Sequence, residues 1–329
     1  MNMRVYVNKN LPLIIGFGCL MGVPLFIDAP YVIHVFIMIF FFGMVSVAWN
    51  ILGGLAGQYS LGHASFMAIG AYVSSMLVIQ LDITPWIGMW ISGLFAGVVA
   101  SCFLYPCFIL RGPYFSLATI AFGETLRNLF TSWDAVGKAQ GILLPIYQDA
   151  WYYMQFSSKL PYYYIGLALL VLIYVVFIYL DQSKLGYAFK SLREDEDAAN
   201  AIGINTARYK LAATFISVTL TAVAGAFYAQ YVRYVEPDLM LVQYSVEIIL
   251  PAIVGGVGTA FGPIIGSFIL TPLSEYLRVA MGSKVAGAHL IVYALILMGI
   301  IRFSPSGIVG WLGGKNIFRT AIMKKLGGR

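Results

Sequence analysis

The sequence predicts an all-α membrane protein, a polytopic bundle of about ten transmembrane helices with both termini in the cytoplasm. Of its 329 residues, 60% are hydrophobic and only 10% are charged, and the mean hydropathy is +0.84. A soluble domain carries about 25% charged residues, so this chain has too little charge to cover a water-facing surface. Stretches without Asp, Glu, Lys or Arg, such as residues 29–81, are long enough for two membrane crossings.

Ten apolar segments approach the length of about 20 residues that a helix needs to cross the hydrocarbon core. The first is expected to be a retained span, because no small-residue cleavage site ends it. The fifth is the least apolar, since it contains Glu124 and Arg127. The eighth and ninth are short enough to form one re-entrant hairpin, which would leave eight spans. The segments are 11–27, 31–51, 61–80, 84–110, 114–132, 161–180, 210–232, 243–256, 261–278 and 288–303.

The basic residues predict the orientation in the membrane. With the N-terminus inside, 14 of the 20 Lys and Arg residues fall on the cytoplasmic side, in agreement with the positive-inside rule. The chain is therefore expected to be one transmembrane domain, residues 1–329. It would have a charged cytoplasmic loop at 181–210 and a basic cytoplasmic tail at 310–329.

Glycine-rich segments follow the second and eighth spans, with the sequences GGLAGQYSLGH and GGVGTAFGP. Their likeness suggests an internal repeat, as many transporters have. Glycines also recur four residues apart, which favours close packing of helix backbones in a membrane. Such pairs include Gly18/Gly22, Gly93/Gly97 and Gly262/Gly266.

The loop 181–210 has the densest charge in the chain and is expected to contain a short helix over 192–202. Ser191 and Glu194 have the capping-box spacing for its start, and Gly203 before an apolar residue suits a Schellman-type end. A helix of this length is marginal alone in water. It should therefore pack on the bundle or on another protein, unless the loop is an ordinary solvated connector.

The same loop resembles a known family. Residues 197–203, DAANAIG, resemble the EAA-xxx-G coupling motif of bacterial ABC import permeases, with Asp197 at the Glu position and Glu196 beside it. Further segments are similar, in order and spacing, to branched-chain amino acid permeases of the LivM type. One departure is GKAQGILLP, where the family often has Gly-Gly-x-x-Gly. The similar segments are GLAGQYSLGHASFMAIGAYV, RGPYFSLATIAFGETLR, VGGVGTAFGPIIGSFIL and RFSPSGIVG.

This resemblance implies a permease subunit in the bacterial inner membrane that imports branched-chain amino acids by alternating access. It implies as partners a second homologous permease, two cytoplasmic ATPase subunits and a periplasmic substrate-binding protein, with lipid around the chain and no nucleic acid. No cofactor is expected on this chain, since it has no GxxxxGK[ST] motif and its partners would use the ATP. The residues implied to couple to the ATPase are Ser191, Arg193, Glu194, Glu196, Asp197, Ala198, Ala199 and Gly203.

Four polar residues in or near the spans are candidates for lining the translocation path: His63, Glu124, Arg127 and Glu247. An ionisable group within a span costs about 2.5–3.5 kcal/mol and usually faces a cavity or a partner. Each candidate has a structural alternative. Glu124 and Arg127 have the i,i+3 spacing of an intrahelical pair, His63 can bind carbonyls freed by the glycine-rich break, and Glu247 can lie at the interface. Three scattered histidines do not predict a metal site.

Three other functions remain open from the sequence. Import of urea or short amides uses the same scaffold. A gradient-driven secondary transporter would need more acidic residues within the spans. An intramembrane enzyme would need a catalytic motif such as GxSxG or HExxH, which the sequence lacks. The chain is thus expected to be a transporter subunit and not an enzyme.

Overall fold

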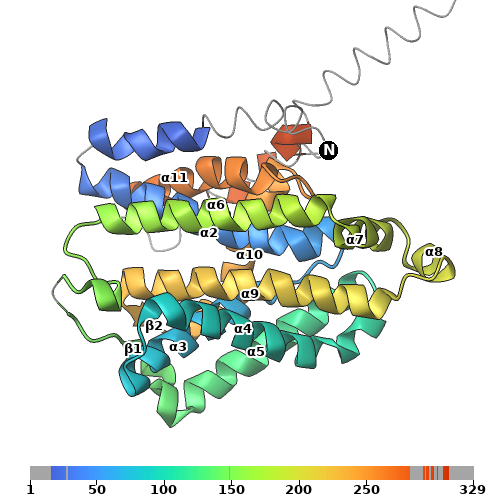
Figure 1. Ribbon diagram of the computed structural model, residues 1–329, viewed down its shortest axis with the longest axis horizontal. Coiled ribbons are helices and arrows are strands. Elements are labelled where there is room, and N and C mark those ends of the chain that lie inside the picture. The colour runs from blue at the N-terminus through green and yellow to red at the C-terminus, as the bar shows by residue number, and fades with distance from the viewer. Residues whose placement is uncertain are drawn as a thin grey trace, which may run out of the picture.

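The computed structural model describes residues 16–26, 29–147, 149–281, 292, 294–295, 298–299, 302 and 307–310. Within these residues the protein is an all-α bundle of lengthwise helices, with one short two-stranded ladder at one end (Figure 1). The predicted tenth span and the predicted basic tail fall almost entirely outside the described residues.

Each predicted span from the second to the ninth corresponds to one helix, and α7 and α8 lie in the charged loop. The helices are α2 Pro30–Asn50, α3 His63–Leu81, α4 Pro85–Leu104, α5 Pro113–Ser132, α6 Leu160–Gln182, α7 Lys184–Glu194, α8 Glu196–Ala201, α9 Thr206–Val232, α10 Val242–Gly255 and α11 Gly262–Met281. The strands are β1 Ile142–Leu143 and β2 Tyr234–Val235. Shorter turns are the π-turn η1 Ile51–Leu55 and the 3-10 turns η2 Pro106–Ile109, η3 Asp134–Val136, η4 Lys138–Gln140, η5 Trp151–Tyr153 and η6 Pro237–Met240.

Five helices in the described part of the chain are long and apolar enough to cross a membrane. They are Pro30–Leu55, His63–Leu81, Pro85–Leu104, Leu160–Gln182 and Thr206–Val232. Helices α5 and α11 each have 20 residues but carry charged side chains, and α10 has 14 residues. A further apolar helix, Gly16–Phe26, lies within the predicted first span. These helices make the chain a multi-pass membrane protein, and the count of ten spans stays a prediction.

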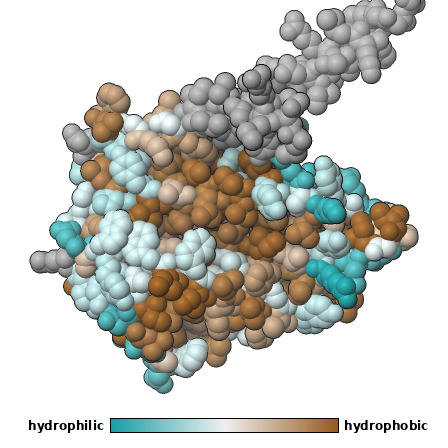
Figure 2. Space-filling view, viewed as in Figure 1, coloured by the Kyte–Doolittle hydropathy of each residue, from teal (hydrophilic) through white to brown (hydrophobic). Residues whose placement is uncertain are grey.

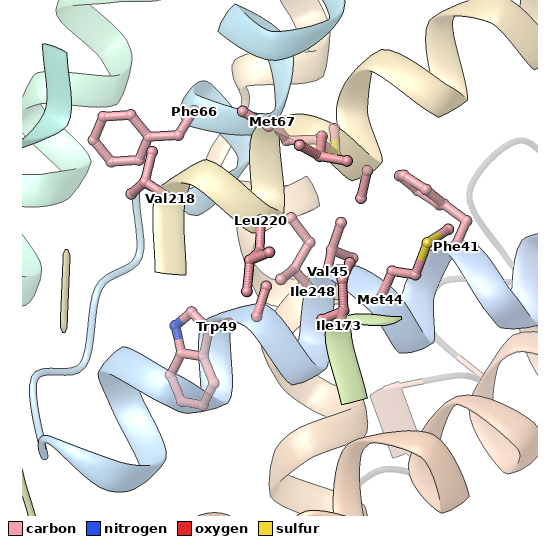
Figure 3. Packing of buried hydrophobic residues seen from close by; sticks show 14 of the residues in the cluster. Phe41, Met44, Val45, Trp49, Phe66, Met67, Ile173, Val218, Leu220 and Ile248 are labelled. Carbon is pink, nitrogen blue, oxygen red and sulfur yellow. The ribbon is translucent and has the colours of Figure 1, made fainter. Parts of the chain in front are cut away.

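The core lies where α2, α3, α6, α9 and α10 meet. Figure 3 shows side chains of this core, among them Phe41 and Met44 of α2, Met67 of α3, Val218 of α9 and Ile248 of α10. Most of the last two-thirds of α2 is buried, so this helix runs through the centre of the bundle. Lipid tails are as apolar as these side chains, so such helices associate through close van der Waals packing.

Helices α3 and α9 cross with their backbones in contact. A Cβ at Gly70 of α3 would overlap the carbonyl oxygen of Ala222, and a Cβ at Gly225 of α9 would overlap that of Met67. Only glycine permits this approach. Two of the glycine pairs predicted from their four-residue spacing also lie at close contacts. At a third pair, Gly18/Gly22, an added Cβ would meet nothing within 4 Å in the described part of the chain. The pairs at close contacts are Gly93/Gly97 and Gly262/Gly266.

The loops gather at the two ends of the bundle. At one end, β1 pairs with β2, and the Trp86 indole N–H donates to the Trp151 carbonyl at 2.9 Å. At the other end, called the α8 end below, α7 and α8 meet the turns that follow α2, α4 and α10 (Figure 1). Figure 2 shows hydrophobic residues across the middle of one face and hydrophilic residues toward both ends. Loops predicted to share one side of the membrane thus lie together.

Candidate functional site

The charged loop forms two helices, α7 and α8, and the single helix predicted over 192–202 is wrong. The two helices meet at Asp195, whose carboxylate accepts hydrogen bonds from the backbone N–H groups of Asp197 at 2.9 Å and Ala198 at 3.0 Å. This carboxylate satisfies donors that the start of α8 leaves unpaired. The predicted capping box is also wrong, because Ser191 lies inside α7 and donates its hydroxyl to a carbonyl one turn earlier.

An apolar stripe explains why α7 continues past the predicted start of the loop helix. Its buried residues recur at helical spacing and face the bundle. A peripheral helix of this kind forms because it covers an apolar surface of the bundle. Capping signals do not report that contact, so they alone placed the start of the loop helix incorrectly. The buried residues are Gly186, Ala188, Phe189 and Leu192.

The end of α8 agrees with the prediction. Gly203 has a left-handed backbone, with φ of +89°. Its N–H donates to the Asn200 carbonyl at 3.0 Å, and the Ile204 N–H donates to the Ala199 carbonyl at 3.0 Å. These two hydrogen bonds form a Schellman motif, which glycine adopts without a steric penalty.

Two ion pairs hold α8 against the bundle, and they differ in burial. Lys210 Nζ lies 2.7 Å from the Glu196 carboxylate and donates to the Phe108 carbonyl at 3.0 Å, and the Lys210 side chain is only 1% exposed. Arg111 donates two hydrogen bonds, of 2.7 and 2.8 Å, to the Asp197 carboxylate, and both of these side chains are exposed. The hydrogen bonds from Arg111 hold the pKa of Asp197 below its usual range. The helix therefore packs on the bundle, which is one of the two arrangements predicted for it.

Arg193, near the end of α7, connects this segment to the two glycine-rich breaks. Its Nη1 donates to the Gly54 carbonyl at 2.7 Å, and a Cβ at Gly258 would clash with the same nitrogen. Asn50 joins the breaks directly, because its Oδ1 accepts from the Gly258 N–H at 2.8 Å and its Nδ2 donates to the Thr259 carbonyl at 2.8 Å. The two similar sequence segments thus meet in space. We call Asn50, Gly54, Arg193 and Gly258 the glycine junction.

The outer side of α8 is exposed. Ala198 is exposed and Ile202 is 74% exposed, whereas the neighbouring Ala199 is 2% exposed and faces the bundle. Glu194 is also exposed, 4.0 Å from Arg193. The predicted coupling residues therefore divide into those that hold α8 in place and those that form its exposed surface.

The predicted path residue His63 is fully buried at the start of α3. Its Nε2 lies 2.9 Å from the Ser217 hydroxyl, which itself donates to the Ala48 carbonyl at 2.7 Å. Because the hydroxyl proton of Ser217 is directed at Ala48, Nε2 is the donor in the contact with Ser217. His63 thus connects α3 to α9 and, through one serine, to the end of α2. The contact is with a serine hydroxyl and not with a backbone carbonyl freed by the glycine-rich break, so it differs from the structural alternative expected for His63.

The other three predicted path residues lie on two helices. On α5, Arg127 pairs with Glu124 at 3.0 Å, as the i,i+3 spacing predicted, and lies 3.5 Å from Asp238 of η6. Glu247 is half-buried on α10, 3.5 Å from the Gln243 amide. The structure therefore does not gather the four path residues into one cluster. Polar residues also lie on the exposed face of α5: Thr125, Asn128 and Ser132.

Sequence reasoning did not single out Asn50, Arg111 or Lys210. Lys210 had a usable signal, because a lysine in the first turns of an apolar helix needs a partner. Asn50 also had one, since it is a polar residue directly before a Gly-Gly pair at the end of a span. The pairing of Arg111 with Asp197 had none, because the two residues are 86 positions apart in the sequence.

Comparisons with known proteins agree with the resemblance of the sequence to a permease family. A family model described as "Branched-chain amino acid transport system / permease component" matches residues 31–301. The high-affinity branched-chain amino acid transport system permease protein LivM of Escherichia coli (strain K12) is 28% identical over 258 residues, which cover 71% of this chain and 61% of that protein. LivM of Salmonella typhimurium is 26% identical with the same coverage.

The permease protein LivH of Escherichia coli (strain K12), named for the same transport system, is 24% identical over 294 residues, which cover 82% of this chain and 91% of that protein. The chain thus spans 61% of the length of the LivM relatives and nearly all of LivH. No solved structure matches the chain.

Proposed function

The chain belongs to the family of branched-chain amino acid transport permeases, and on this basis we propose that it is the membrane-spanning subunit of an ATP-driven importer. The importer moves branched-chain amino acids, or closely related ones, into the cytoplasm by alternating access across the bacterial inner membrane. ATP is hydrolysed by separate subunits, and this chain binds no cofactor. The names of the relatives, which are high-affinity permeases for these amino acids, support the assignment.

The importer contains two homologous permeases, two cytoplasmic ATPase subunits and a periplasmic substrate-binding protein. The similarity of this chain to both LivM and LivH of one organism supports the pairing of two related permeases. In this arrangement the chain crosses the membrane ten times, and α8 and both termini face the cytoplasm. The concentration of basic residues in the loops at the α8 end supports that orientation.

The observation that supports this function most directly is the construction of α8. An isolated helix of six residues has no stable shape in water. Here the N-cap, the Schellman end and the buried Lys210–Glu196 pair fix it at one end of the bundle. Its exposed side, with Ala198 and Ile202, is then a small rigid surface suited to contact with an ATPase subunit.

Movement of α8 reaches the bundle through the glycine junction. Arg193 connects α7 to the Gly54 carbonyl at the end of α2 and lies against Gly258 in the turn after α10. Because α2 runs through the core, a displacement of its end is passed to the packed helices as a rigid-body shift. The π-turn η1 is a local distortion of the kind often found at functional sites in helices.

The translocation path runs beside α5 and α10, next to Glu124, Arg127 and Glu247. The exposed face of α5 carries polar side chains, which lipid tails do not satisfy. A water-filled path shared with the second permease suits this face. His63 supports the path indirectly, because it fixes α3 to α9 and to the end of α2.

The coupling role is tested in proteoliposomes that contain the complete transporter. Ala198→Arg and Ile202→Arg each place a bulky charge on the exposed side of α8. We expect both to abolish substrate-stimulated ATP hydrolysis and leucine uptake without lowering the thermal unfolding temperature of the permease, since neither side chain is buried. Gln182→Arg is the matched control, because Gln182 is exposed at the same end of the bundle but outside α8.

Several outcomes would contradict the proposed function. Normal ATP-driven uptake in both arginine variants would remove the coupling role from α8. Uptake that stops with an ionophore and is indifferent to ATP would indicate a gradient-driven transporter. Uptake of labelled urea that leucine does not inhibit would indicate a short-amide permease. Labelling of a cysteine at position 202 only from the periplasmic side would reverse the orientation.

A further inference from the structure

A pocket of about 260 Å³ lies between α2, α9, α10 and α11. Tyr228, one turn before the end of α9, and Leu239 of η6 border it, so it lies in the half of the bundle nearer the β1–β2 end. Drug-sized ligands occupy sites of about 300–1,000 Å³, so this volume suits a smaller metabolite.

The pocket has an apolar wall and a charged wall. Phe41 and Phe42 of α2 and Met67 of α3 form much of the apolar wall. The charged wall comes from α10 and α11 and contains Glu247, Glu275 and Arg278. A pocket with an apolar surface and a few convergent charged groups is the usual form of a site for a small polar solute.

The three charged side chains are not equally satisfied. Arg278 Nη2 lies 2.5 Å from the Glu275 carboxylate, whose side chain is 7% exposed. Glu247 has no cation within ion-pair distance in the described part of the chain, and its polar neighbour is the Gln243 amide at 3.5 Å. An unpaired carboxylate against an apolar wall is costly. A positively charged group on a ligand would compensate it.

Arg278 retains donors for a negatively charged group. A guanidinium has five N–H donors, and one nitrogen of Arg278 faces Glu275. The Arg278 side chain is 58% exposed, so the rest of the guanidinium is accessible to a solute in the pocket. Guanidinium groups bind carboxylates through two parallel hydrogen bonds.

We propose that this pocket binds a zwitterionic α-amino acid with an apolar side chain. The ammonium group lies at Glu247, the carboxylate at Arg278, and the aliphatic side chain against Phe41, Phe42 and Met67. The proposal rests on the proposed function, since it supplies a substrate subsite within that importer. An uncharged solute such as urea would gain no charge–charge attraction from either group, so the pocket favours an amino acid.

The pocket narrows in the direction of the α8 end. A neighbouring cavity of only about 20 Å³ shares Glu247 and Glu275 and extends to Pro251 and Leu270. That volume holds about one water molecule, so an amino acid in the larger pocket cannot advance in this conformation. Pro251 lies inside α10 and removes one of its backbone hydrogen bonds, which makes this a point at which α10 can bend to open the route.

The test measures binding of three ligands to the full-length permease pair in nanodiscs, without the substrate-binding protein. Leucine carries both charges, leucinamide lacks the carboxylate, and 4-methylpentanoate lacks the ammonium group. We expect wild-type protein to bind leucine about tenfold or more tighter than either analogue, because each analogue loses one charge-assisted contact. Equal binding of all three would overturn the proposal.

The variants assign each charge to one residue. Glu247→Gln should remove the preference for leucine over 4-methylpentanoate and keep the preference over leucinamide. Arg278→Gln should do the reverse. Arg278→Gln leaves Glu275 buried without a cation, so the double variant E275Q/R278Q provides a folded comparison. Glu236→Gln is the matched control, because Glu236 lies in the loop after β2, outside the pocket.

The outcomes separate this pocket from the importer assignment. If both single variants and the double variant keep both preferences, the pocket is not the subsite, and ATP-driven leucine uptake by the wild-type transporter still supports the proposed function. If the ligand preferences follow the expected pattern but the complete transporter takes up no leucine, the importer assignment fails and the binding site remains.

Discussion

Replacement of Lys210 by methionine tests whether α8 is held in place by the bundle. The buried ammonium group of Lys210 lies 2.7 Å from Glu196 and donates to the Phe108 carbonyl at 3.0 Å. Methionine fills a similar volume but supplies neither charge nor donor. Removal of one member of a buried ion pair costs about 3–5 kcal/mol. Because the Glu196 side chain keeps 20% exposure and can turn to water, we expect a cost of about 3 kcal/mol.

The expected effect is local detachment of α8. A cost of about 3 kcal/mol changes the equilibrium between attached and detached α8 by roughly 100-fold. Hydrogen exchange with mass spectrometry in nanodiscs measures this change at the Gly203 and Ile204 N–H groups, which close the Schellman motif. Exchange at these amides should accelerate by up to that factor, and substrate-stimulated ATP hydrolysis should fall with it.

Two further variants make this prediction specific. Arg111→Met also removes a cation from a carboxylate of α8, but that pair is exposed, so exchange should change little. The double variant K210M/E196M removes both buried charges, which is often nearly neutral, and should restore most of the protection. Equal effects of K210M and R111M, or unchanged exchange in K210M, would show that the buried pair does not hold α8.

Two other predictions concern the packing and the exposed ion pair. Gly70→Ala should lower the thermal unfolding temperature, because the added Cβ overlaps the Ala222 carbonyl and overpacking costs about 1–3 kcal/mol. Gly18→Ala should not lower it, because the added Cβ meets nothing within 4 Å among the residues that the structure describes. Similar losses in both variants would contradict the close crossing of α3 and α9. Hydrogen bonds from Arg111 lower the pKa of Asp197, so the stability that Asp197 adds is present above about pH 3.9 and is lost only as the pH falls through the lowered value. Because the pair is exposed, Asp197→Asn should lower the protection of α8 only slightly, and this small difference from wild type, corrected for intrinsic exchange, should be the same at pH 5 and pH 8. A difference that disappears at pH 5 would refute this.

The helices of the bundle could be predicted because the mean hydropathy of about 20 residues depends only on the sequence of that segment and not on its neighbours in space. Each predicted span from the second to the ninth corresponds to a helix, and all of these spans except the seventh start within two residues of the expected positions. The fourth span was predicted to reach residue 110, but α4 ends at Leu104. The following 3-10 turn starts at Pro106, which has no backbone N–H to continue the hydrogen-bond ladder of the helix. Hydropathy does not detect such a stop, because the turn is also apolar.

The roles of the charged residues could be predicted only where the partners are close in sequence. The Glu124–Arg127 pair and the Gly203 helix end depend on spacings of a few residues, and both occur as expected. The start of α8 could not be located from the sequence, because an apolar stripe extends α7. The stabilisation that this stripe gives depends on the surface of the bundle that it covers. The sequence therefore identified the charged loop but not its division into two helices.

The sequence by itself determined that this chain is a multi-pass membrane protein of the permease family, since composition, span length and local motifs carry that information. Only the tertiary structure decided that Lys210 fixes α8, that Arg193 connects two distant glycine-rich breaks, and that Glu247 and Arg278 line one pocket. The physical reason is that helices in lipid gain little hydrophobic energy from any particular neighbour. Close contacts of small residues, such as Gly70 with Ala222, select the neighbours, and those contacts decide which distant charges meet.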